Sequence, residues 1–336
     1  MSEIARNINM AELARRAGVS VSTVSRALSG SSVVNRKTRE KIAALAREFD
    51  FRPNAQARNL RLQRTNAIGV LLPLGHQSDQ HLTDPFFLAM LGYLADAIAD
   101  RGYDMLLSKI IPSSDDWLDA LVDSNRFDGV VIVGQSNQAA QIDRAAQRYR
   151  KIVAWGARLP DQHYVSVGTD NRRGGGLAAE HLIARGRRKL LFLGDPRAPE
   201  IEQRQAGFMD ACTAAGIASD ATSLDIELVA ETAHARLRQH FAQPVDVDGI
   251  VAASDVIAMA AIRALSEHGR QVPQEISITG FDDVMLAAHT VPPLTTVRQD
   301  LQRGAGLMID ALFALMAGES VQSIEMPPEL IVRASS

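Results

Sequence analysis

From residue 67 onward, short apolar runs alternate with longer amphipathic stretches, and this alternation restricts the possible folds more than any other feature of the chain. The apolar runs have the length of buried strands and occupy residues 68–72, 105–108, 130–133, 152–155, 164–167, 190–194, 226–229, 250–253 and 276–280. Stretches with helical spacing lie among them, at residues 85–101, 117–124, 137–150, 175–184, 203–215, 232–241 and 255–268. Buried strands that alternate with helices form parallel sheets covered on both faces. Two successive series of this kind predict an α/β fold with two similar lobes, each a doubly wound parallel sheet.

The first 66 residues differ from the rest of the chain in charge. They contain 13 Lys and Arg against 5 Asp and Glu, whereas the remaining 270 residues contain 23 against 34. The net charges are therefore +8 and −11, which sum to the −3 of the whole chain. A small basic segment joined to a large acidic one indicates that the two parts have different partners.

The basic segment contains signals for three short helices. Asn9 can cap a first helix, and Gly18 supplies the left-handed residue that ends it. A second helix follows over residues 21–28 after only a few turn residues, and a third begins near Asn35. Two short helices joined by a glycine-containing turn, with a third packed across them, predict an all-α helix-turn-helix domain over residues 7–50.

The second of these helices is the one that would enter the major groove of DNA. A valine there can contact a thymine methyl group, serine can donate or accept a hydrogen bond, and arginine can bind guanine through two bonds. Hydroxyl groups also suit phosphate oxygens. The candidate DNA-binding residues are Ser20, Val21, Ser22, Thr23, Ser25 and Arg26. The positive charge and this hydroxyl-rich face favour DNA over the alternative, a small three-helix domain with a solvated basic face.

Six short motifs, spread over nearly the whole chain, resemble those of one protein family. They are GVSVSTVSRAL at residues 18–28, KTREKI at 37–42, RPNAQARNL at 52–60, PFF at 85–87, GFDD at 280–283 and PLTT at 293–296. In this order and spacing they resemble the lactose-repressor (LacI/GalR) family of bacterial transcription regulators. The resemblance implies a periplasmic-binding-protein-like body in which the chain crosses between lobes near residues 168, 296 and 323. The implied lobes are residues 67–168 with 297–323, and residues 169–296 with 324–336.

Residues 51–66 lie between the head and the body and are expected to form a hinge. Pro53 suits the first position of a helix, and residues 54–60 have moderate to good helix propensity. A helix of about seven residues is not stable alone in water. The resemblance implies that this segment folds on the operator beside its copy in a second subunit, with Leu60 inserted into the minor groove. The alternative is an ordinary flexible linker.

In parallel sheets, ligands bind beyond the carboxyl ends of the strands, and two facing lobes form a crevice there. Three carboxylates occupy such positions, those of Asp84, Asp255 and Asp282. Each can accept hydrogen bonds from sugar hydroxyls, although the first two can instead cap helices and the third can simply form a turn. Of the neighbouring Phe86 and Phe87, one can offer its ring to a sugar while the other packs inside the lobe.

Two further effector-binding candidates come from the resemblance. Arg204 matches the family's effector-binding arginine and can bind two oxygens, although a lone arginine is more often a surface charge. Asp170 lies beside Asn171 at the first crossing, where the family often has a polar effector contact, and can instead only form the turn. Trp155 ends a strand, where it either lines the crevice or packs in the core.

Several classes of function lack their motifs in this sequence. There is no phosphate loop of the form GxxxxGK[S/T] and no GxGxxG after the first strand, and the eight histidines show no metal-ligand spacing. No set of catalytic residues is evident, so we expect neither enzyme activity nor a metal or cofactor. The single cysteine, Cys212, and the lack of an apolar run approaching about 18 residues fit a cytoplasmic protein without membrane spans.

These features together predict a repressor that binds a pseudo-palindromic DNA operator as a homodimer and responds to a small carbohydrate. Three carboxylates, an arginine and aromatic rings suit a neutral mono- or disaccharide better than an anion. The chain ends without a leucine heptad, and we expect a dimer rather than a tetramer. A cytoplasmic sugar-binding module or enzyme on the same two-lobed scaffold is one alternative, and a transcriptional activator is another. The effector can release the protein from DNA or act as a co-repressor.

Overall fold

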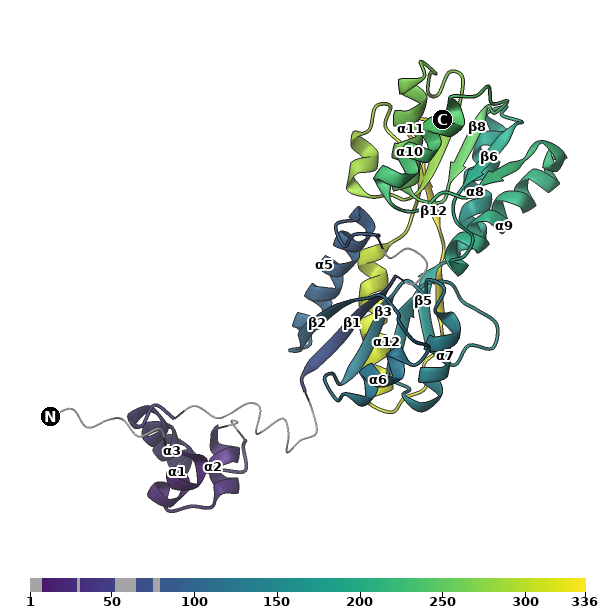
Figure 1. The fold of residues 1–336 in the computed structure, drawn as a ribbon. Coiled ribbons are helices and arrows are strands. Elements are labelled where there is room, and N and C mark those ends of the chain that lie inside the picture. The colour runs from purple at the N-terminus through teal and green to yellow at the C-terminus, as the bar shows by residue number, and fades with distance from the viewer. Residues whose placement is uncertain (1–7, 29–30, 52–64, 75–78) are drawn as a thin grey trace. The chain divides into compact units, whose positions relative to one another are not determined.

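The computed structural model describes residues 8–28, 31–51, 65–74 and 79–336, which we refer to as the described residues. The chain divides into two compact units, Met1–Thr65 and Asn66–Ser336, which we call the head and the body. Figure 1 shows the helices of the head and the two lobes of the body. The expected hinge helix and Leu60 lie outside the described residues.

The described residues of the head form a domain of three helices, α1 (Met10–Ala17), α2 (Val21–Leu28) and α3 (Arg36–Glu48). Local signals begin and end α1: the Asn9 Oδ1 atom accepts a hydrogen bond from a first-turn amide at 2.9 Å, and Gly18 has a φ of 70°. Leu13, Val24 and Ile42, one from each helix, are fully buried. These side chains form one small apolar core that holds the three helices together.

The first lobe of the body is a six-stranded sheet of order β11-β5-β4-β3-β1-β2, in which all neighbouring strands are parallel. Its strands are β1 (Ala67–Pro73), β2 (Asp104–Ile110), β3 (Gly129–Val133), β4 (Ile152–Trp155), β5 (Val165–Thr169) and β11 (Ile324–Met326). Its helices are α5 (Pro85–Asp100), α6 (Trp117–Asp123), α7 (Ala139–Arg148) and α12 (Leu301–Met316). The first and last of these pack on one face through side chains such as Met90 and Met308, and the other two pack on the opposite face through Leu118 and Ile142.

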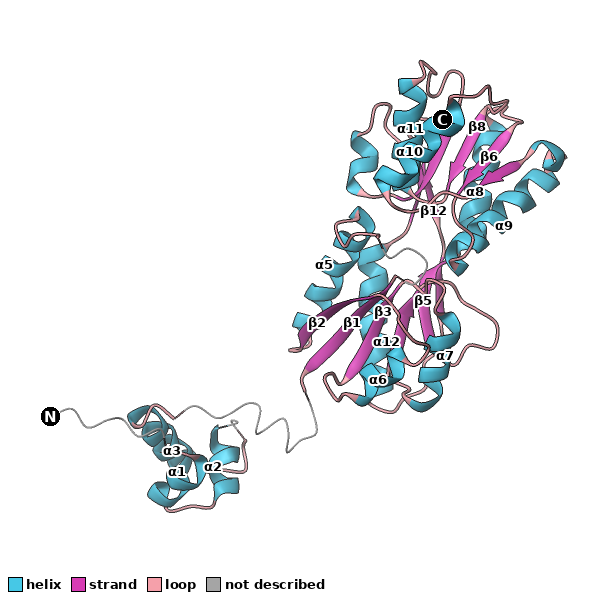
Figure 2. Cartoon of the chain, viewed as in Figure 1, coloured by secondary structure: helices cyan, strands magenta, loops and turns pink. Residues whose placement is uncertain are grey.

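The second lobe repeats this arrangement with the strand order β12-β10-β9-β8-β6-β7. Its strands are β6 (Leu190–Leu193), β7 (Thr222–Leu224), β8 (Gly249–Ala252), β9 (Ser277–Asp282), β10 (Thr295–Arg298) and β12 (Glu329–Ile331). Its helices are α8 (Asn171–Ala184), α9 (Pro199–Ala214), α10 (Ala230–Phe241) and α11 (Asp255–Glu267), with the 3-10 helices η1 (Ala218–Asp220) and η2 (Met285–His289). Only β12 is antiparallel to its neighbour among the described strands of this sheet. Figure 2 shows helices flanking both sheets.

The predicted fold class is confirmed, because an all-α head precedes an α/β body with two doubly wound, mainly parallel sheets. The central strands β1, β3 and β4 are buried along their whole length. Strands covered by helices on both faces have no solvent side, which is why their sequences form continuous apolar runs. Among the described residues, no helix is both long enough and apolar enough to cross a bilayer.

The strand expected over residues 226–229 is wrong. The edge strand of the second sheet is β7, which ends two residues earlier, and residues 226–229 have no regular secondary structure. Ile226 is nevertheless fully buried. An apolar side chain can anchor a loop in the core as well as belong to a strand, and a short apolar run does not distinguish the two.

The expected position of the last crossing is also wrong. The sequence assigns residues 324–336 to the second lobe, but β11 pairs with β5 of the first sheet, with Ile324 opposite Val167. The chain therefore crosses between Met326 and Glu329, where β12 begins. Pairing with β5 satisfies backbone polar groups of the extended segment before it leaves the first lobe, and this long-range contact has no local signature.

Candidate DNA-binding surface and effector cavity

The start of α2 carries the candidate DNA-binding side chains. Four of them, Ser20, Val21, Ser22 and Arg26, are exposed, and two, Thr23 and Ser25, are half-buried. Val24 and Ala27 from the same helix are buried in the core of the head. The Ser20 Oγ atom accepts a hydrogen bond from the Thr23 amide at 3.2 Å and so caps the helix. The candidate side chains therefore lie on the helix face that does not pack against the core.

Some of the basic side chains of the head bind within it. The Lys41 ammonium group on α3 donates to the Ala17 carbonyl at the end of α1, at 2.9 Å. The Arg39 guanidinium group donates to the Ser31 and Val34 carbonyls at 3.0 and 2.8 Å. Part of the positive charge of the head therefore stabilises its own fold.

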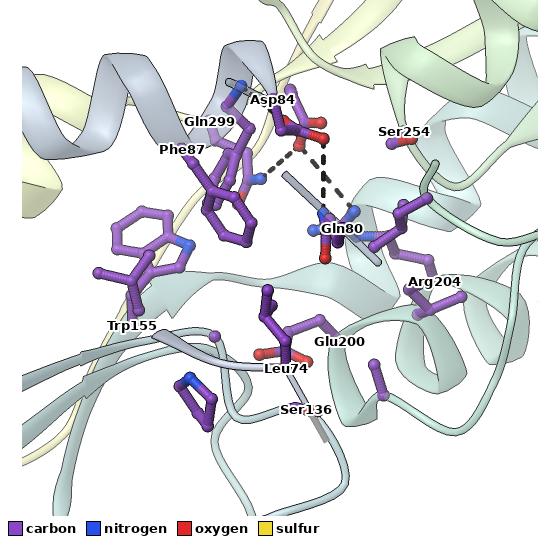
Figure 3. Close-up of a pocket in the computed structure, with 18 residues that line it drawn as sticks. Leu74, Gln80, Asp84, Phe87, Ser136, Trp155, Glu200, Arg204, Ser254 and Gln299 are labelled. Atoms are coloured by element: carbon purple, nitrogen blue, oxygen red, sulfur yellow. Dashed lines mark hydrogen bonds and ion pairs between the residues drawn. The ribbon is translucent and has the colours of Figure 1, made fainter. Parts of the chain in front are cut away.

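A cavity of about 100 Å³ lies between the two lobes of the body. Its lining differs from one side to the other, because the first lobe contributes mainly apolar and aromatic side chains and the second contributes most of the charged ones. The lining includes Leu74, Asp84, Phe86, Phe87 and Trp155 from the first lobe, and Glu200, Arg204, Ser254, Asp282 and Gln299 from the second lobe and its crossing (Figure 3). About 10–15 Å³ of such space holds one water molecule, so the cavity has room for a small solute.

Arg204 on α9 joins several elements of the second lobe and is only 7% exposed. Its Nε atom donates to Asn171 Oδ1 at 2.8 Å, and its Nη1 atom donates to the Ala253 carbonyl at 2.6 Å. The guanidinium lies 3.7 Å from the centroid of the Phe281 ring, and Nη1 lies 4.0 Å from Asp282 Oδ1. Burial lowers the pKa of Arg204, and the negative charge of Asp282 opposes this effect. The arginine therefore connects α8, the end of β8 and the end of β9 at the cavity wall.

Asp282 lies at the end of β9 and is 5% exposed. Its Oδ1 atom accepts a hydrogen bond from Gln299 Nε2 at 2.7 Å. Its φ is 117° and that of Asp283 is 55°, so two consecutive non-glycine residues have left-handed backbone conformations, a strain that concentrates at functional sites. Burial raises the pKa of Asp282 to about 7, although the positive charge of Arg204 opposes this shift. Near neutral pH the carboxyl group can therefore donate as well as accept a hydrogen bond.

The first lobe positions its cavity residues through the start of α5. The Asp84 Oδ1 atom accepts from the Phe86 amide at 2.9 Å and caps the helix, while Gln80 Nε2 lies 3.4 Å from Oδ2. Burial raises the pKa of Asp84. Phe87 is buried in the core of this lobe, whereas Phe86 is half-buried and lies 6.5 Å, ring centroid to ring centroid, from Trp155. Asp84 therefore both caps α5 and lines the cavity.

Two of the sequence candidates, Asp255 and Asp170, are not among the described residues that line the cavity. Asp255 is fully buried, with Oδ1 accepting from Thr296 Oγ1 at 2.5 Å and Oδ2 accepting from the Val284 amide at 2.9 Å. Burial raises the pKa of Asp255. The Asp170 Oδ1 atom caps α8 by accepting from the Arg173 amide at 2.9 Å. In the structure, Asp255 holds the turn after β9 and Asp170 holds the start of α8, so their positions do not support contact with an effector.

Glu200 and Gln299 line the cavity, but sequence reasoning did not identify them. Glu200 opens α9 four residues before Arg204, and residues at this spacing share a helix face. Gln299 directly follows β10, at the carboxyl end of a strand. The sequence contains a signal for each residue: helix periodicity places Glu200 on the same face as Arg204, and Gln299 lies at the carboxyl end of a strand, where ligands bind in parallel sheets.

The cavity offers hydrogen-bonding groups and ring faces rather than metal ligands. Among the described residues, no three His, Cys, Asp or Glu side chains are grouped so that they could hold a metal ion. Carboxylates, a guanidinium and aromatic rings are together suited to binding a polar organic solute.

Comparison with known proteins assigns the head and the second part of the body to two different family models. Residues 9–54 match the family model of bacterial regulatory proteins, lacI family, and residues 179–336 match that of a periplasmic binding protein-like domain. The HTH-type transcriptional regulator CelR of Thermobifida fusca is 28% identical over 335 residues, which cover 96% of each chain. The HTH-type transcriptional repressor PurR of Erwinia tasmaniensis is 30% identical over 336 residues, which cover 96% of this chain and 95% of PurR.

Two solved structures are similar over 98% of this chain. The Lac repressor dimer bound to operator and the anti-inducer ONPF has a TM-score of 0.84 at 25% identity, with 99% of that chain covered. The complex of the transcriptional regulator CelR with cellobiose has a TM-score of 0.69 at 26% identity, with 100% of that chain covered. The fold and site thus define a helix-turn-helix regulator with a periplasmic-binding-protein-like body. The chain belongs to the lacI family of bacterial regulatory proteins, which confirms the resemblance carried by the sequence motifs.

Proposed function

We propose that this protein is a homodimeric transcriptional repressor that binds a pseudo-palindromic DNA operator through its head. Its affinity for the operator changes when a small carbohydrate occupies the cavity between the lobes. Membership of the lacI family supports a regulatory role, and the similar Lac repressor was solved as a dimer on its operator. In the head, the exposed side chains at the start of α2 are the proposed base and phosphate contacts, and Leu60 is the proposed minor-groove contact.

The residues that line the cavity are the main support for a carbohydrate ligand. Asp84 and Asp282 can accept hydrogen bonds from sugar hydroxyls, and Arg204 can donate to hydroxyl oxygens. Phe86 and Phe87 add aromatic surface for the apolar faces of a sugar ring. CelR, a similar regulator, was solved with cellobiose. These groups support a neutral mono- or disaccharide as the effector.

The effector acts by favouring one arrangement of the lobes. A ligand can change operator affinity only by as much as its affinity differs between the two arrangements. We propose induction, in which the sugar lowers operator affinity, and a co-repressor would change the same measurement in the opposite direction. The cavity then serves to bind the ligand and has no enzymatic role.

Operator binding by the full chain tests this proposal. The protein is incubated with a library of inverted-repeat duplexes and with random duplex at one fixed salt concentration, because phosphate contacts make affinity depend on salt. We expect one preferred inverted repeat and a lower affinity for it when cellobiose or glucose is added. No preference for any inverted repeat over random duplex would contradict the proposal. Transcription that rises when the protein binds would identify an activator.

Arg26→Ala tests the proposed recognition helix. We expect operator binding to weaken by about 1–3 kcal/mol, with relaxed preference at one base pair in each half-site, because arginine discriminates through its bonds to a base edge. Titration of operators mutated at single positions measures this preference. Equal weakening on every sequence would instead identify Arg26 as a phosphate contact.

A further inference from the structure

We propose that Glu200 is a ligand-binding residue of the cavity and that it selects effectors with neutral, hydrogen-bond-donating groups over anionic ones. This inference rests on the proposed function of the cavity as the effector site. Glu200 lies in the first turn of α9 and reaches into the cavity between the lobes (Figure 3). It is not one of the positions that the sequence motifs identify, so its role depends on the structure.

The Glu200 carboxylate is held at the junction of the two lobes. Its Oε1 atom accepts a hydrogen bond from the Gln135 amide, which follows β3 of the first lobe, at 3.1 Å. Gln135 is itself buried and fixed: its Nε2 atom donates to the Ala157 carbonyl at 2.8 Å and to the Tyr164 hydroxyl at 2.7 Å, and its Oε1 accepts from the Ala157 amide at 2.9 Å. The partner of Glu200 is therefore rigid, which distinguishes this carboxylate from a mobile surface acid.

A glycine of the first lobe lies beside the Glu200 carboxylate. Gly156, which follows β4, is buried beside it, and a Cβ atom at this position would lie 2.6 Å from both Glu200 Oε1 and Gln135 Oε1. A larger residue at position 156 would displace one of these two side chains. The glycine therefore allows the close approach of Glu200 to the first lobe.

The charges that line the cavity do not balance. Among the described residues, the lining contains the carboxylates of Asp84, Glu200 and Asp282 against the single guanidinium of Arg204. Two of the nitrogens of that guanidinium already donate to Asn171 and to a backbone carbonyl. An anionic ligand would face three acidic groups and one basic group at short range. Asp282, with a pKa of about 7, carries only part of a charge near neutral pH, but each ionised carboxylate repels an anion strongly in a poorly solvated site.

Hydroxyl groups are suitable partners for these carboxylates, because an ionised carboxylate only accepts hydrogen bonds and can accept two from neighbouring hydroxyls. Burial raises the pKa of Glu200, while its hydrogen bond from the Gln135 amide and the positive charge of Arg204 oppose the rise. A neutral sugar supplies donors without adding charge. A sugar acid or sugar phosphate supplies an anion that Glu200 would oppose.

Glu200→Gln tests the inference in the full-length protein, with Glu202→Gln as the matched control. Glu202 lies in the same first turn of α9, is exposed and does not line the cavity. Both substitutions remove one negative charge from the same helix terminus and keep the length of the side chain. Calorimetric titration with glucose, cellobiose, glucuronate and glucose 6-phosphate gives the affinity of each protein for neutral and anionic probes.

We expect the wild-type protein to prefer the neutral probes. In Glu200→Gln, affinity for the better neutral probe falls at least tenfold and affinity for the better anionic probe rises at least tenfold, whereas Glu202→Gln behaves as wild type. A merely structural role would lower both affinities by the same factor, and that result would overturn the inference, as would unchanged affinities in Glu200→Gln.

The same measurements distinguish a failure of the proposed function from a failure of the proposed role of Glu200. The wild-type protein could instead bind an anionic probe more tightly than the neutral ones and lose operator affinity with it. This result would refute the role of Glu200 but would still support a ligand-controlled repressor. A wild-type protein that binds none of the four probes would overturn both the inference and the sugar effector. Specific operator binding by the same protein would still support the DNA-binding part of the proposal.

Discussion

The two lobes of the body have the same sheet order but present different chemistry to the cavity between them. The first lobe contributes mainly rings and apolar side chains, such as Phe86 and Trp155, which are packed against its core. The second contributes Glu200, Arg204 and Asp282, which are buried or half-buried charged groups. The doubly wound topology therefore determines where the side chains of the two lobes meet, and the identity of the residues at the strand ends determines which ligand the cavity can bind.

The two lobes also differ in how far their cavity residues depend on one another. The rings are held by apolar contacts, which have no directional requirement and act locally. The charged groups are coupled, since burial raises the pKa of Asp282 while the charge of Arg204 opposes the rise, and Arg204 donates hydrogen bonds to two other elements of its lobe. Substitutions in the second lobe should therefore have effects that spread, and those in the first should stay local.

The largest effect is expected for Arg204→Met, which keeps an apolar stem and removes the guanidinium. Asn171 Oδ1 and the Ala253 carbonyl lose their donor, and the buried Asp282 loses its nearby positive charge. We expect the free energy of unfolding to fall by about 3 kcal/mol and effector binding to weaken by about 2–5 kcal/mol. Urea unfolding and calorimetric titration measure the two changes. A variant as stable as the wild type would mean that the charges of the second lobe act independently.

A smaller, local effect is expected for Phe86→Ala in the first lobe. The ring lines the cavity and is half-buried, so its loss should weaken effector binding by about 1 kcal/mol. Tyr103→Ala is the control, because that ring packs against Phe313 with centroids 5.0 Å apart and does not line the cavity. The control should lower the free energy of unfolding and leave effector affinity unchanged. Equal affinities for Phe86→Ala and the wild type would remove this ring from the site.

The last prediction concerns the pH dependence of stability, tested with Asp282→Asn. The folded pKa of Asp282 is about 7, above the ordinary value of 3.8, because burial disfavours the charged form. Between these values the folded protein keeps a proton that the unfolded chain has lost, so the unfolding free energy of the wild type falls as pH rises through this interval. Asparagine does not titrate. The stability of Asp282→Asn relative to the wild type should therefore increase by about 3 kcal/mol between pH 4 and pH 7.

Urea unfolding of both proteins at pH 4.5, 6 and 8 measures this difference. Arg204, Asp84 and Asp255 are the charged groups that act on or face Asp282, and they are present in both proteins. Because the charge of Asp282 raises the pKa of Asp255, the substitution also changes the titration of Asp255, and the measured difference contains both effects. Parallel stability curves would show that the Asp282 carboxyl group is ionised throughout this range.

Much of the site could be predicted from sequence because the residues lie where local rules apply. Asp84, Arg204 and Asp282 follow from the strand-end rule and from the family motifs, and all three line the cavity. The same rule also selects Asp255, and the resemblance selects Asp170, but their carboxylates instead hold nearby backbone or hydroxyl groups. A position at a strand end does not determine whether a side chain turns into the crevice or back into its own lobe, because that depends on partners far away in the sequence.

The sequence alone determined the helices of the head, the parallel character of both sheets and the membership of a family of DNA-binding regulators. Each of these depends on contiguous patterns, namely caps, apolar runs and short motifs. Only the tertiary structure decided that β11 belongs to the first sheet, and that Glu200 contacts an amide 65 residues away in the other lobe. Such contacts arise when the folded chain brings distant segments together, and their distances and charge balance have no counterpart in the linear order of residues.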